Sequence, residues 1–356
     1  MARRRALMLG AGGMAGVWIR HMLPNFKERL LIAGLVDIDP TALKESGDFL
    51  GLEEDQRFTS MQEAFDTVDA DLCIVVVPPA FHKEAVLLAA AKGMDILSEK
   101  PIANTWQACC DIYRAVKEAG VKMTVVQNYR FTPWILAVKE TLLSGELGAI
   151  NYIVARFAED YRVANSWGKF RHEIADALVI EGSIHHFDQL RHFSGSDCVK
   201  IAGFSWNPHW SSFAGDCCGL YVMEFANGVR ASYEGSCMAA ASVNGWHGEL
   251  YRIECERGAV SVGADRVVRI ERRIDRARTE RTEITRPGNP LDGHNAVIRS
   301  CLDWLDGGPA APTHLDDNIK SAAMMFAAIE ASKNRACVDV AAMLSPLGVD
   351  LSGLSA

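Results

Sequence analysis

The sequence predicts an α/β protein, with an N-terminal doubly wound parallel sheet and a C-terminal α+β domain built on a mostly antiparallel sheet. Two patterns predict it. Short apolar runs alternate with helical segments over the first 125 residues, as in sheets whose parallel strands are joined by crossover helices. From residue 151, strand-like runs instead follow one another at hairpin spacing. We therefore expect two domains, 1–125 and 126–356, which suits 356 residues at roughly 150 residues per domain.

The N-terminal strands are short and apolar, as expected where helices cover both faces of a sheet. The clearest spans 72–77 and ends at Pro78-Pro79, because proline cannot donate a hydrogen bond to the sheet. The other strands are predicted over 6–9, 30–36, 95–98 and 121–126. Helices are predicted over 12–21, from the capping box Ser60–Glu63 to Phe65, over 82–92 before Gly93, and over 105–119 before Gly120.

The second domain is predicted to contain more strands than helices. The strands are expected over 152–158, 200–206, 219–225, 230–235, 250–255 and 267–272, and the helices over 182–193, 294–305 and 317–332. Asn227-Gly228 is a tight-turn dipeptide between two of these strands. In the run 271–286, charges of opposite sign alternate, which indicates a solvated hairpin.

The composition excludes several classes of function. Lys and Arg number 37 against 45 Asp and Glu, which gives a net charge of −8 and a pI near 5.7. We therefore expect neither nucleic acid nor an anionic membrane surface as a partner, because both require a basic face. No apolar run approaches the roughly 18 residues of a membrane-spanning helix.

The cysteines and the N-terminus bear on the compartment. Ten scattered cysteines form no Cys-x-x-Cys pair, which favours a reduced, cytoplasmic protein. Arg3-Arg4-Arg5 before the apolar stretch 6–19 resembles a signal peptide. Cleavage there would remove a glycine-rich turn to which we assign a function below, so we expect the protein to stay in the cytoplasm.

A glycine-rich turn, Gly10-Ala-Gly12-Gly13-Met14-Ala15, lies between the first predicted strand and helix and fits the pattern G-x-G-x-x-G/A. Gly10 permits the tight turn, Gly12 lets backbone amides approach a pyrophosphate, and Ala15 lets the helix pack closely on the strand. Asp37 ends the second strand, where its carboxylate can accept both ribose hydroxyls. The combination predicts a dinucleotide site rather than a flexible glycine loop. NAD is favoured over NADP, because Asp37 would repel a 2′-phosphate and no arginine follows it closely.

Glu99-Lys100-Pro101 follows the strand predicted over 95–98. This is the carboxyl edge of the sheet, where open α/β sheets bind their ligands. There Lys100 can hydrogen-bond a substrate hydroxyl and stabilise negative charge that develops on its oxygen. The alternative is a surface Glu–Lys pair before a turn.

Four ionisable residues recur at helical spacing near residue 185. Glu181, His185, Asp188 and His192 are spaced i, i+4, i+7 and i+11, on one stripe of a helix. Carboxylates and imidazoles on one stripe suit an acid–base site. The alternatives are a solvent-facing charged stripe, a metal site without the standard ligand spacing, and histidines that only pack, most readily His186 and His192.

Together these motifs resemble the Gfo/Idh/MocA family of sugar and polyol oxidoreductases. The resemblance rests on Gly10–Ala15, Asp37, Pro78-Pro79-Ala-Phe-His82, Glu99-Lys100-Pro101, Gln127-Asn-Tyr-Arg130-Phe, Glu181-x3-His185-x2-Asp188 and Asp317-Asn318-x-Lys320-Ser321. It implies an N-terminal Rossmann domain and a C-terminal domain with a large, open antiparallel sheet. In the family, the face of that sheet commonly mediates homodimers or homotetramers.

The resemblance also implies residue roles. Lys100 looks like the catalytic lysine that polarises the substrate oxygen, and His185 like the general acid/base that takes the hydroxyl proton while hydride passes to NAD. Glu181 stands where the family usually has Asp, so its role stays open between orienting His185 and contacting substrate. The implied cofactor contacts are Gly10, Gly12, Gly13, Met14, Asp37, Pro78, His82, Glu99, Lys100 and Asn128.

We expect the substrate to be a sugar, an inositol or another polyol, and we expect no metal. The expected substrate contacts are Lys100, Tyr129, Arg130, Trp167, Arg171, Glu181 and His185, with Asn128, Trp210 and His247 as further candidates. Two other functions stay open on the same fold: an NAD-dependent glycoside hydrolase, and a non-catalytic sensor of a dinucleotide and a sugar. The presence of both Lys100 and His185 speaks against the sensor only.

Overall fold

The computed structural model describes residues 3–351. They divide into two compact units, each made of two stretches of sequence. The first consists of the residues up to Asn128 together with Gly293–Ile319, and the second of Tyr129–Asp292 together with the residues from Lys320 onward. Local sequence patterns do not reveal that the chain returns to the first unit near residue 300, because such patterns reflect neighbours along the chain and not distant partners.

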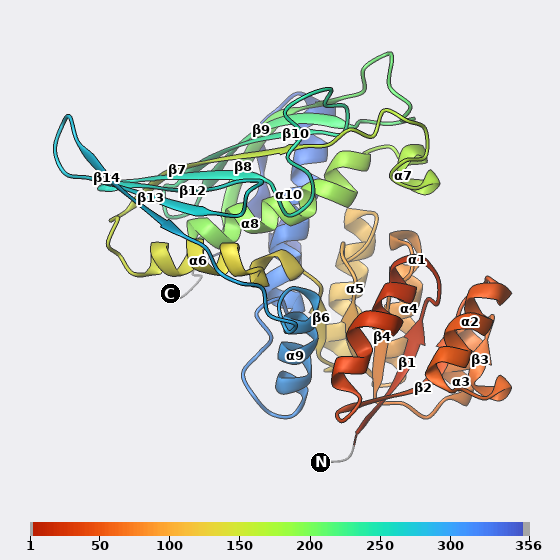
Figure 1. The fold of residues 1–356 in the computed structure, drawn as a ribbon. Helices are drawn as coiled ribbons and strands as arrows, with labels where there is room; N and C mark the ends of the chain where they lie inside the picture. The colour runs from red at the N-terminus through yellow and green to blue at the C-terminus, as the bar shows by residue number, and fades with distance from the viewer. Residues whose placement is uncertain (1–2, 352–356) are drawn as a thin grey trace. The chain divides into compact units, whose positions relative to one another are not determined.

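The first unit contains a six-stranded sheet in the order β3-β2-β1-β4-β5-β6 (Figure 1). All of its strand pairs are parallel, which confirms the doubly wound parallel sheet. The strand order reverses at β1, so the ends of β1, β2 and β4 meet at one carboxyl edge. The strands are β1 (Arg4–Leu9), β2 (Leu30–Val36), β3 (Arg57–Phe58), β4 (Leu72–Val75), β5 (Asp95–Ser98) and β6 (Met123–Val125).

The helices of the first unit are α1 (Gly13–Val17), α2 (Pro40–Leu50), α3 (Met61–Thr67), α4 (His82–Ala91), α5 (Trp106–Ala119) and α9 (His294–Leu305). The helix predicted over 12–21 is α-helical only to Val17 and continues as a π-helix over Trp18–Met22. Helix α2 lies where the sequence analysis predicts no element. Its start has a clear local cause: Asp39 accepts hydrogen bonds from two amides of the first turn, and Pro40 occupies the first helical position.

The second unit contains a nine-stranded sheet in the order β14-β13-β12-β11-β7-β10-β9-β8-β15. Every strand pair is antiparallel except β7–β10, so the mostly antiparallel sheet is confirmed. The strands are β7 (Ile150–Ala158), β8 (Cys198–Trp206), β9 (Cys218–Phe225), β10 (Arg230–Ser236), β11 (Leu250–Cys255), β12 (Gly258–Val262), β13 (Val268–Arg273), β14 (Thr279–Ile284) and β15 (Val338–Asp339).

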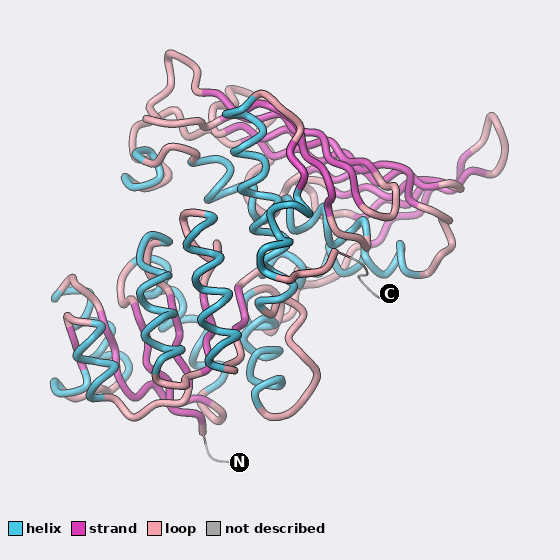
Figure 2. Tube along the Cα trace, turned by 180° about the vertical axis from the view of Figure 1, so that it is seen from behind, coloured by secondary structure: helices cyan, strands magenta, loops and turns pink. Residues whose placement is uncertain are grey.

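Helices cover one face of this sheet. Besides α7 (Lys169–Glu173) and α11 (Val340–Leu344), the unit contains α6 (Pro133–Leu143), α8 (Ile184–Ser194) and most of α10 (Leu315–Asn334). Figures 1 and 2 show α6 and α8 along the same face. Side chains alternate accordingly along β9, where Tyr221 and Met223 are buried while Leu220 and Val222 are exposed.

The charged run at 271–286 forms the end of the sheet. It contributes β14, whose residues Thr279–Glu283 are all exposed, and it projects as a hairpin in Figure 1, which confirms the predicted solvated hairpin. Among residues 3–351, no helix has both the length and the apolar character needed to cross a membrane.

Candidate active site

The glycine-rich turn connects β1 to α1 beside the end of β2. Gly10 has a φ of +102°, and a Cβ built there would lie 2.2 Å from the carbonyl oxygen of Val76, so a side chain does not fit. The backbone amides of Ala11 and Gly12 donate to Oδ2 of Asp37 at 2.6 and 3.2 Å. Asp37 therefore holds the turn in place from the neighbouring strand.

The surroundings of this turn fit a dinucleotide. A carboxylate has about four lone-pair positions that can accept hydrogen bonds. Three backbone amides donate to Asp37: those of Ala11 and Gly12, and that of Asp39 at 2.9 Å from Oδ1. Acceptor capacity is left for a ribose hydroxyl. A Cβ built on Gly13 meets nothing within 4 Å, and a cavity of about 410 Å³, lined by Gly12, Gly13 and Arg20 among others, adjoins the turn. A bulky, polar ligand can approach the backbone there.

Glu99 is a buried carboxylate at the end of β5 with three donors around it. Its Oε1 accepts from Trp18 Nε1 at 2.9 Å and lies 3.4 Å from His294 Nε2, and its Oε2 accepts from the Lys100 amide at 3.2 Å. Burial raises the pKa of Glu99, but the bond from His294 and the charges of His294 and Lys100 outweigh it, so the pKa lies below its usual value. Glu99 is therefore ionised. Its hydrogen bonds from Trp18 and from the Lys100 amide hold the start of the turn that carries Lys100.

The other residues expected near the cofactor lie in different environments. His82 is fully buried, with Nδ1 2.9 Å from the carbonyl oxygen of Pro101 and Nε2 2.9 Å from that of Val77. Burial lowers the pKa of His82. Its ring bridges the turns that follow β4 and β5. Pro78 is exposed on the first of these turns, and Asn128 is buried.

The helix that carries His185 differs from the predicted regular stripe. Leu178–Ser183 form a π-helix, and regular α-helix begins only at Ile184, so Glu181 lies outside it. Glu181, His185 and Asp188 are buried, which excludes the solvent-facing stripe. Among residues 3–351, no three His, Cys, Asp or Glu side chains are grouped so that they could hold a metal ion.

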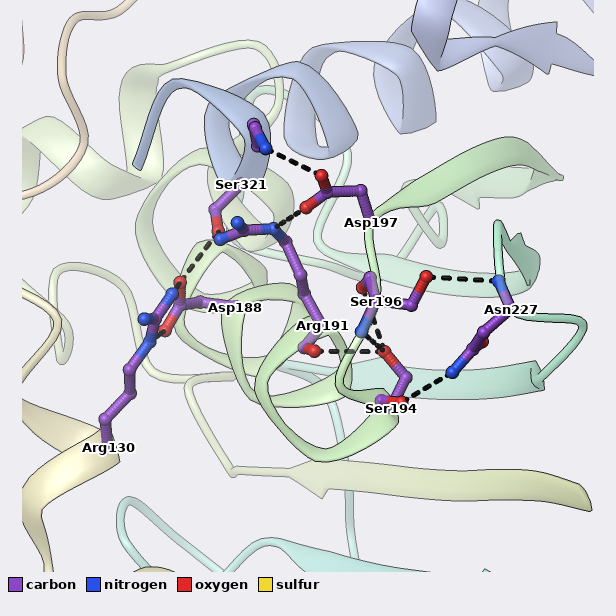
Figure 3. Close-up of polar contacts among 9 residues, drawn as sticks. Arg130, Asp188, Arg191, Ser194, Ser196, Asp197, Asn227 and Ser321 are labelled. Carbon is purple, nitrogen blue, oxygen red and sulfur yellow. Dashed lines mark hydrogen bonds and ion pairs between the residues drawn. The ribbon is translucent and has the colours of Figure 1, made fainter. Parts of the chain in front are cut away.

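Asp188 forms a buried ion pair with Arg130, shown in Figure 3. The Arg130 guanidinium donates to both carboxylate oxygens, from Nε at 2.7 Å and from Nη2 at 2.6 Å, and Ser321 Oγ donates to Oδ1 at 2.7 Å. On the same helix, Arg191 donates to Asp197 at 2.7 Å and to Ser321 at 3.4 Å. The network ties α8 to the start of the unit and to α10. Arg130 was expected to contact the substrate, and its guanidinium binds Asp188.

The Tyr129 ring stacks on that of His185, with centroids 4.3 Å apart and planes 11° apart. Tyr129 also lies 4.1 Å from the ring of His247. His247 has a φ of +62°, which is uncommon for a residue with a side chain. Of the residues predicted from sequence, Tyr129, His185 and His247 are thus brought together.

Glu181 is paired with Arg171. Arg171 Nε donates to Glu181 Oε2 at 2.8 Å, and its Nη1 donates to the carbonyl oxygen of Trp167 at 3.1 Å. The Trp167 ring stacks on Tyr161 at 5.0 Å and lies 5.5 Å from Trp246. These predicted residues form a second group in the same unit. Trp210 is exposed.

Glu249 is a further buried acidic residue that no sequence motif indicates. This carboxylate is buried, and its Oε1 lies 3.4 Å from His186 Nε2, while His186 Nδ1 lies 2.8 Å from the Tyr233 hydroxyl. Burial, and then the charge of Glu249, raises the pKa of Tyr129 well above its usual value. A single glutamate between a loop and a strand belongs to no spacing pattern. The one signal in the sequence is that Glu249 lies two residues after His247, which was a candidate substrate contact.

Comparison with known proteins assigns both parts of the chain to one family. Residues 4–127 match the Gfo/Idh/MocA model described as an oxidoreductase family with an NAD-binding Rossmann fold, and residues 139–340 match the family's C-terminal alpha/beta domain. An uncharacterized protein of Sinorhizobium fredii is 36% identical over 335 residues, 92% of each chain. The D-apiose dehydrogenase of Rhizobium rhizogenes is 23% identical over 321 residues, 88% of this chain and 91% of its own.

A solved structure shows the same fold. An oxidoreductase from Agrobacterium radiobacter, in complex with NAD+, L-tartaric acid and magnesium, aligns with a TM-score of 0.84 at 21% identity, over 96% of this chain and 100% of its own. At that identity the likeness concerns the fold alone. The family models, in contrast, span both units. The chain therefore belongs to the Gfo/Idh/MocA family of oxidoreductases, with an N-terminal NAD-binding Rossmann domain.

Proposed function

We propose that the protein is an NAD-dependent dehydrogenase or reductase that transfers hydride between nicotinamide and a secondary alcohol or ketone of a sugar, polyol or related cyclic compound. The placement of His185 carries this proposal. Its imidazole is buried and stacked on Tyr129, so it has one orientation, as general acid–base catalysis requires. The relation to D-apiose dehydrogenase over most of the chain supports a sugar as the substrate class.

Three side chains carry the chemistry in this proposal. His185 Nδ1 is buried, so we assign the substrate proton to Nε2. The Lys100 ammonium polarises the substrate oxygen and stabilises the charge that develops when the proton leaves. Glu181, held by Arg171, orients the substrate or His185. NAD, when bound, accepts the hydride.

The test is turnover with a panel of inositols, aldoses, anhydrosugars and sugar acids, each with NAD and with NADP, followed by nicotinamide absorbance. We expect NAD-linked turnover on part of the panel and its loss in Lys100→Met. Lys83→Met removes an exposed lysine of the same unit, which pairs with Asp111, and serves as the matched control. Cleavage of a glycoside without net NADH formation would instead favour the hydrolase.

We propose that NAD is preferred over NADP because of the Asp37 carboxylate. In Asp37→Asn, we expect NADH to bind about 10-fold more weakly, since a hydrogen bond to a charged acceptor is replaced by a neutral one. We also expect NADPH to bind more tightly, since the repulsion of its phosphate is lost. Fluorescence titration measures both affinities. Asp39→Asn, which changes only the cap of α2, is the control, and an unchanged NADH-to-NADPH ratio in Asp37→Asn would contradict the assignment.

We propose a homodimer or homotetramer formed through the uncovered face of the nine-stranded sheet. Phe204, Leu220 and Val222 are 50–58% exposed there, on the adjacent strands β8 and β9, beside a hollow of about 620 Å³. Monomeric proteins rarely leave such a contiguous apolar patch in water. Leu220→Glu/Val222→Glu is expected to reduce the mass measured by light scattering to that of one chain without affecting NADH binding. The control is Val163→Glu, at an exposed loop position. A monomeric wild type would refute the proposal.

A further inference from the structure

The Glu99 carboxylate joins three segments of the first unit that are far apart in sequence. Trp18 belongs to the π-helix that follows α1 and the glycine-rich turn, Lys100 follows β5, and His294 is the first residue of α9. Trp18 Nε1 and His294 Nε2 both approach Oε1, at 2.9 and 3.4 Å, and the Lys100 amide donates to Oε2 at 3.2 Å. One carboxylate therefore sets the position of the Lys100 backbone relative to the cofactor turn.

His294 is the partner of Glu99 that comes from outside the two turns. Its ring lies edge-on to Trp18, with centroids 6.0 Å apart and planes 82° apart, so its orientation is fixed by packing as well as by Glu99. Its side chain is 20% exposed, against 10% for that of Glu99. A buried carboxylate is costly unless it is paired, and His294 supplies that partner on the side away from the Lys100 amide.

Several groups that face Glu99 affect the pKa of its carboxylate. His294, Lys100 and Trp18 lower its pKa against the effect of burial. His82, between the turns after β4 and β5, also senses the Glu99 charge. If His294 were removed, the carboxylate would lose a partner on Oε1 and would turn toward the Lys100 ammonium. Only the neutral amine of a lysine is nucleophilic, and a carboxylate partner favours the charged form, so a lysine paired in this way is acylated more slowly.

We propose that His294 is a positioning residue for Lys100, and that it acts through Glu99 together with Trp18. The inference rests on the proposed function only for the catalytic consequence, because the placement of Lys100 can be measured without a substrate. His294 lies in Gly293–Ile319, the stretch of sequence that follows the second sheet and belongs to the first unit.

The first arm of the test is trace acetylation of the full-length protein with acetic anhydride. Mass spectrometry gives the labelling of Lys100 relative to Lys83, an exposed lysine of the same unit. We expect His294→Ala to lower this ratio at least 3-fold, and Trp18→Phe, which keeps a buried ring but removes the N–H donor, to lower it in the same direction. His294→Gln keeps a donor for Glu99 and is expected to stay within 1.5-fold of the wild type.

The matched control is His314→Gln. His314 lies on the same returning segment and is also edge-on to a tryptophan, Trp304, at 5.8 Å, but its Nδ1 lies 2.8 Å from a backbone carbonyl instead of a carboxylate. We expect its labelling ratio to equal that of the wild type. If His294→Ala, His294→Gln and His314→Gln all give the wild-type ratio, His294 does not position Lys100 and the inference is wrong.

The second arm is kinetic and uses the substrate found with the panel. We expect His294→Ala to lower kcat about 10-fold, to change the KM for NAD less than 2-fold, and to alter the pH profile of kcat, which His294→Gln restores. A merely structural role would instead lower thermal stability and affect kcat and KM alike, which would overturn the inference. If the wild type shows no turnover, the proposed function fails, while the labelling arm still decides the inference.

Discussion

Replacing Asp188 by asparagine is expected to lower the free energy of unfolding of the protein by about 3–5 kcal/mol. The carboxylate is completely buried, and the Arg130 side chain that it binds with two hydrogen bonds is 8% exposed. Without the carboxylate, the guanidinium is left charged at a site where little of it reaches water. The loss therefore reflects an uncompensated charge more than the strength of the pair itself.

Urea denaturation followed by circular dichroism measures this effect. The matched double variant Arg130→Met/Asp188→Leu removes both charges, and we expect it to recover most of the lost stability, because apolar replacements of a buried pair are often neutral. Asp69→Asn removes a solvent-exposed partner of Arg5 and is expected to leave the urea midpoint unchanged. An Asp188→Asn midpoint equal to that of the wild type would show that the pair is not buried in solution.

Replacing His185 by alanine is expected to lower kcat roughly 10²–10⁴-fold, the usual contribution of a general acid–base residue. The imidazole is buried and stacked on Tyr129, so neither water nor a neighbour takes over its proton without a rearrangement. NADH affinity is expected to stay within 2-fold of the wild-type value, because the cofactor turn belongs to the other unit.

The measurement is steady-state turnover with the panel substrate, together with NADH fluorescence titration. His209→Ala serves as the control, since His209 is an exposed histidine of the same unit. Retention of more than a tenth of the wild-type kcat by His185→Ala, with the fold intact, would assign the proton to another group. Glu181 would then be the first candidate.

Local sequence patterns predict both sheets and the glycine-rich turn between the first strand and helix. Position 10 requires glycine, because a Cβ there would lie 2.2 Å from the carbonyl oxygen of Val76. Strand β4 consists of buried apolar residues. Both features are visible within a few positions of the chain. The helix near residue 185 was predicted with one regular period, but the π-helix over Leu178–Ser183 changes the angular spacing of Glu181. Hydrophobic periodicity alone does not reveal such a change.

The pairings between distant residues could not be predicted. Arg130 was interpreted from its position after a strand, whereas its guanidinium binds Asp188, 58 residues along the chain. The contact of Glu249 with His186 and that of His294 with Glu99 also join separate segments. One sequence does not specify which charged groups meet, because the same residue types form surface pairs throughout this chain.

The return of Gly293–Ile319 to the first unit affects the order in which the protein can fold during synthesis. When Asn128 leaves the ribosome, all six parallel strands have been made, but helix α9 has not. The ribosome must first make residues 129–292, which takes on the order of ten to thirty seconds at roughly 5–20 residues per second. The N-terminal unit is therefore completed only after most of the second unit has emerged. A fragment cut at residue 128, however well its strands pair, would lack the histidine that faces Glu99.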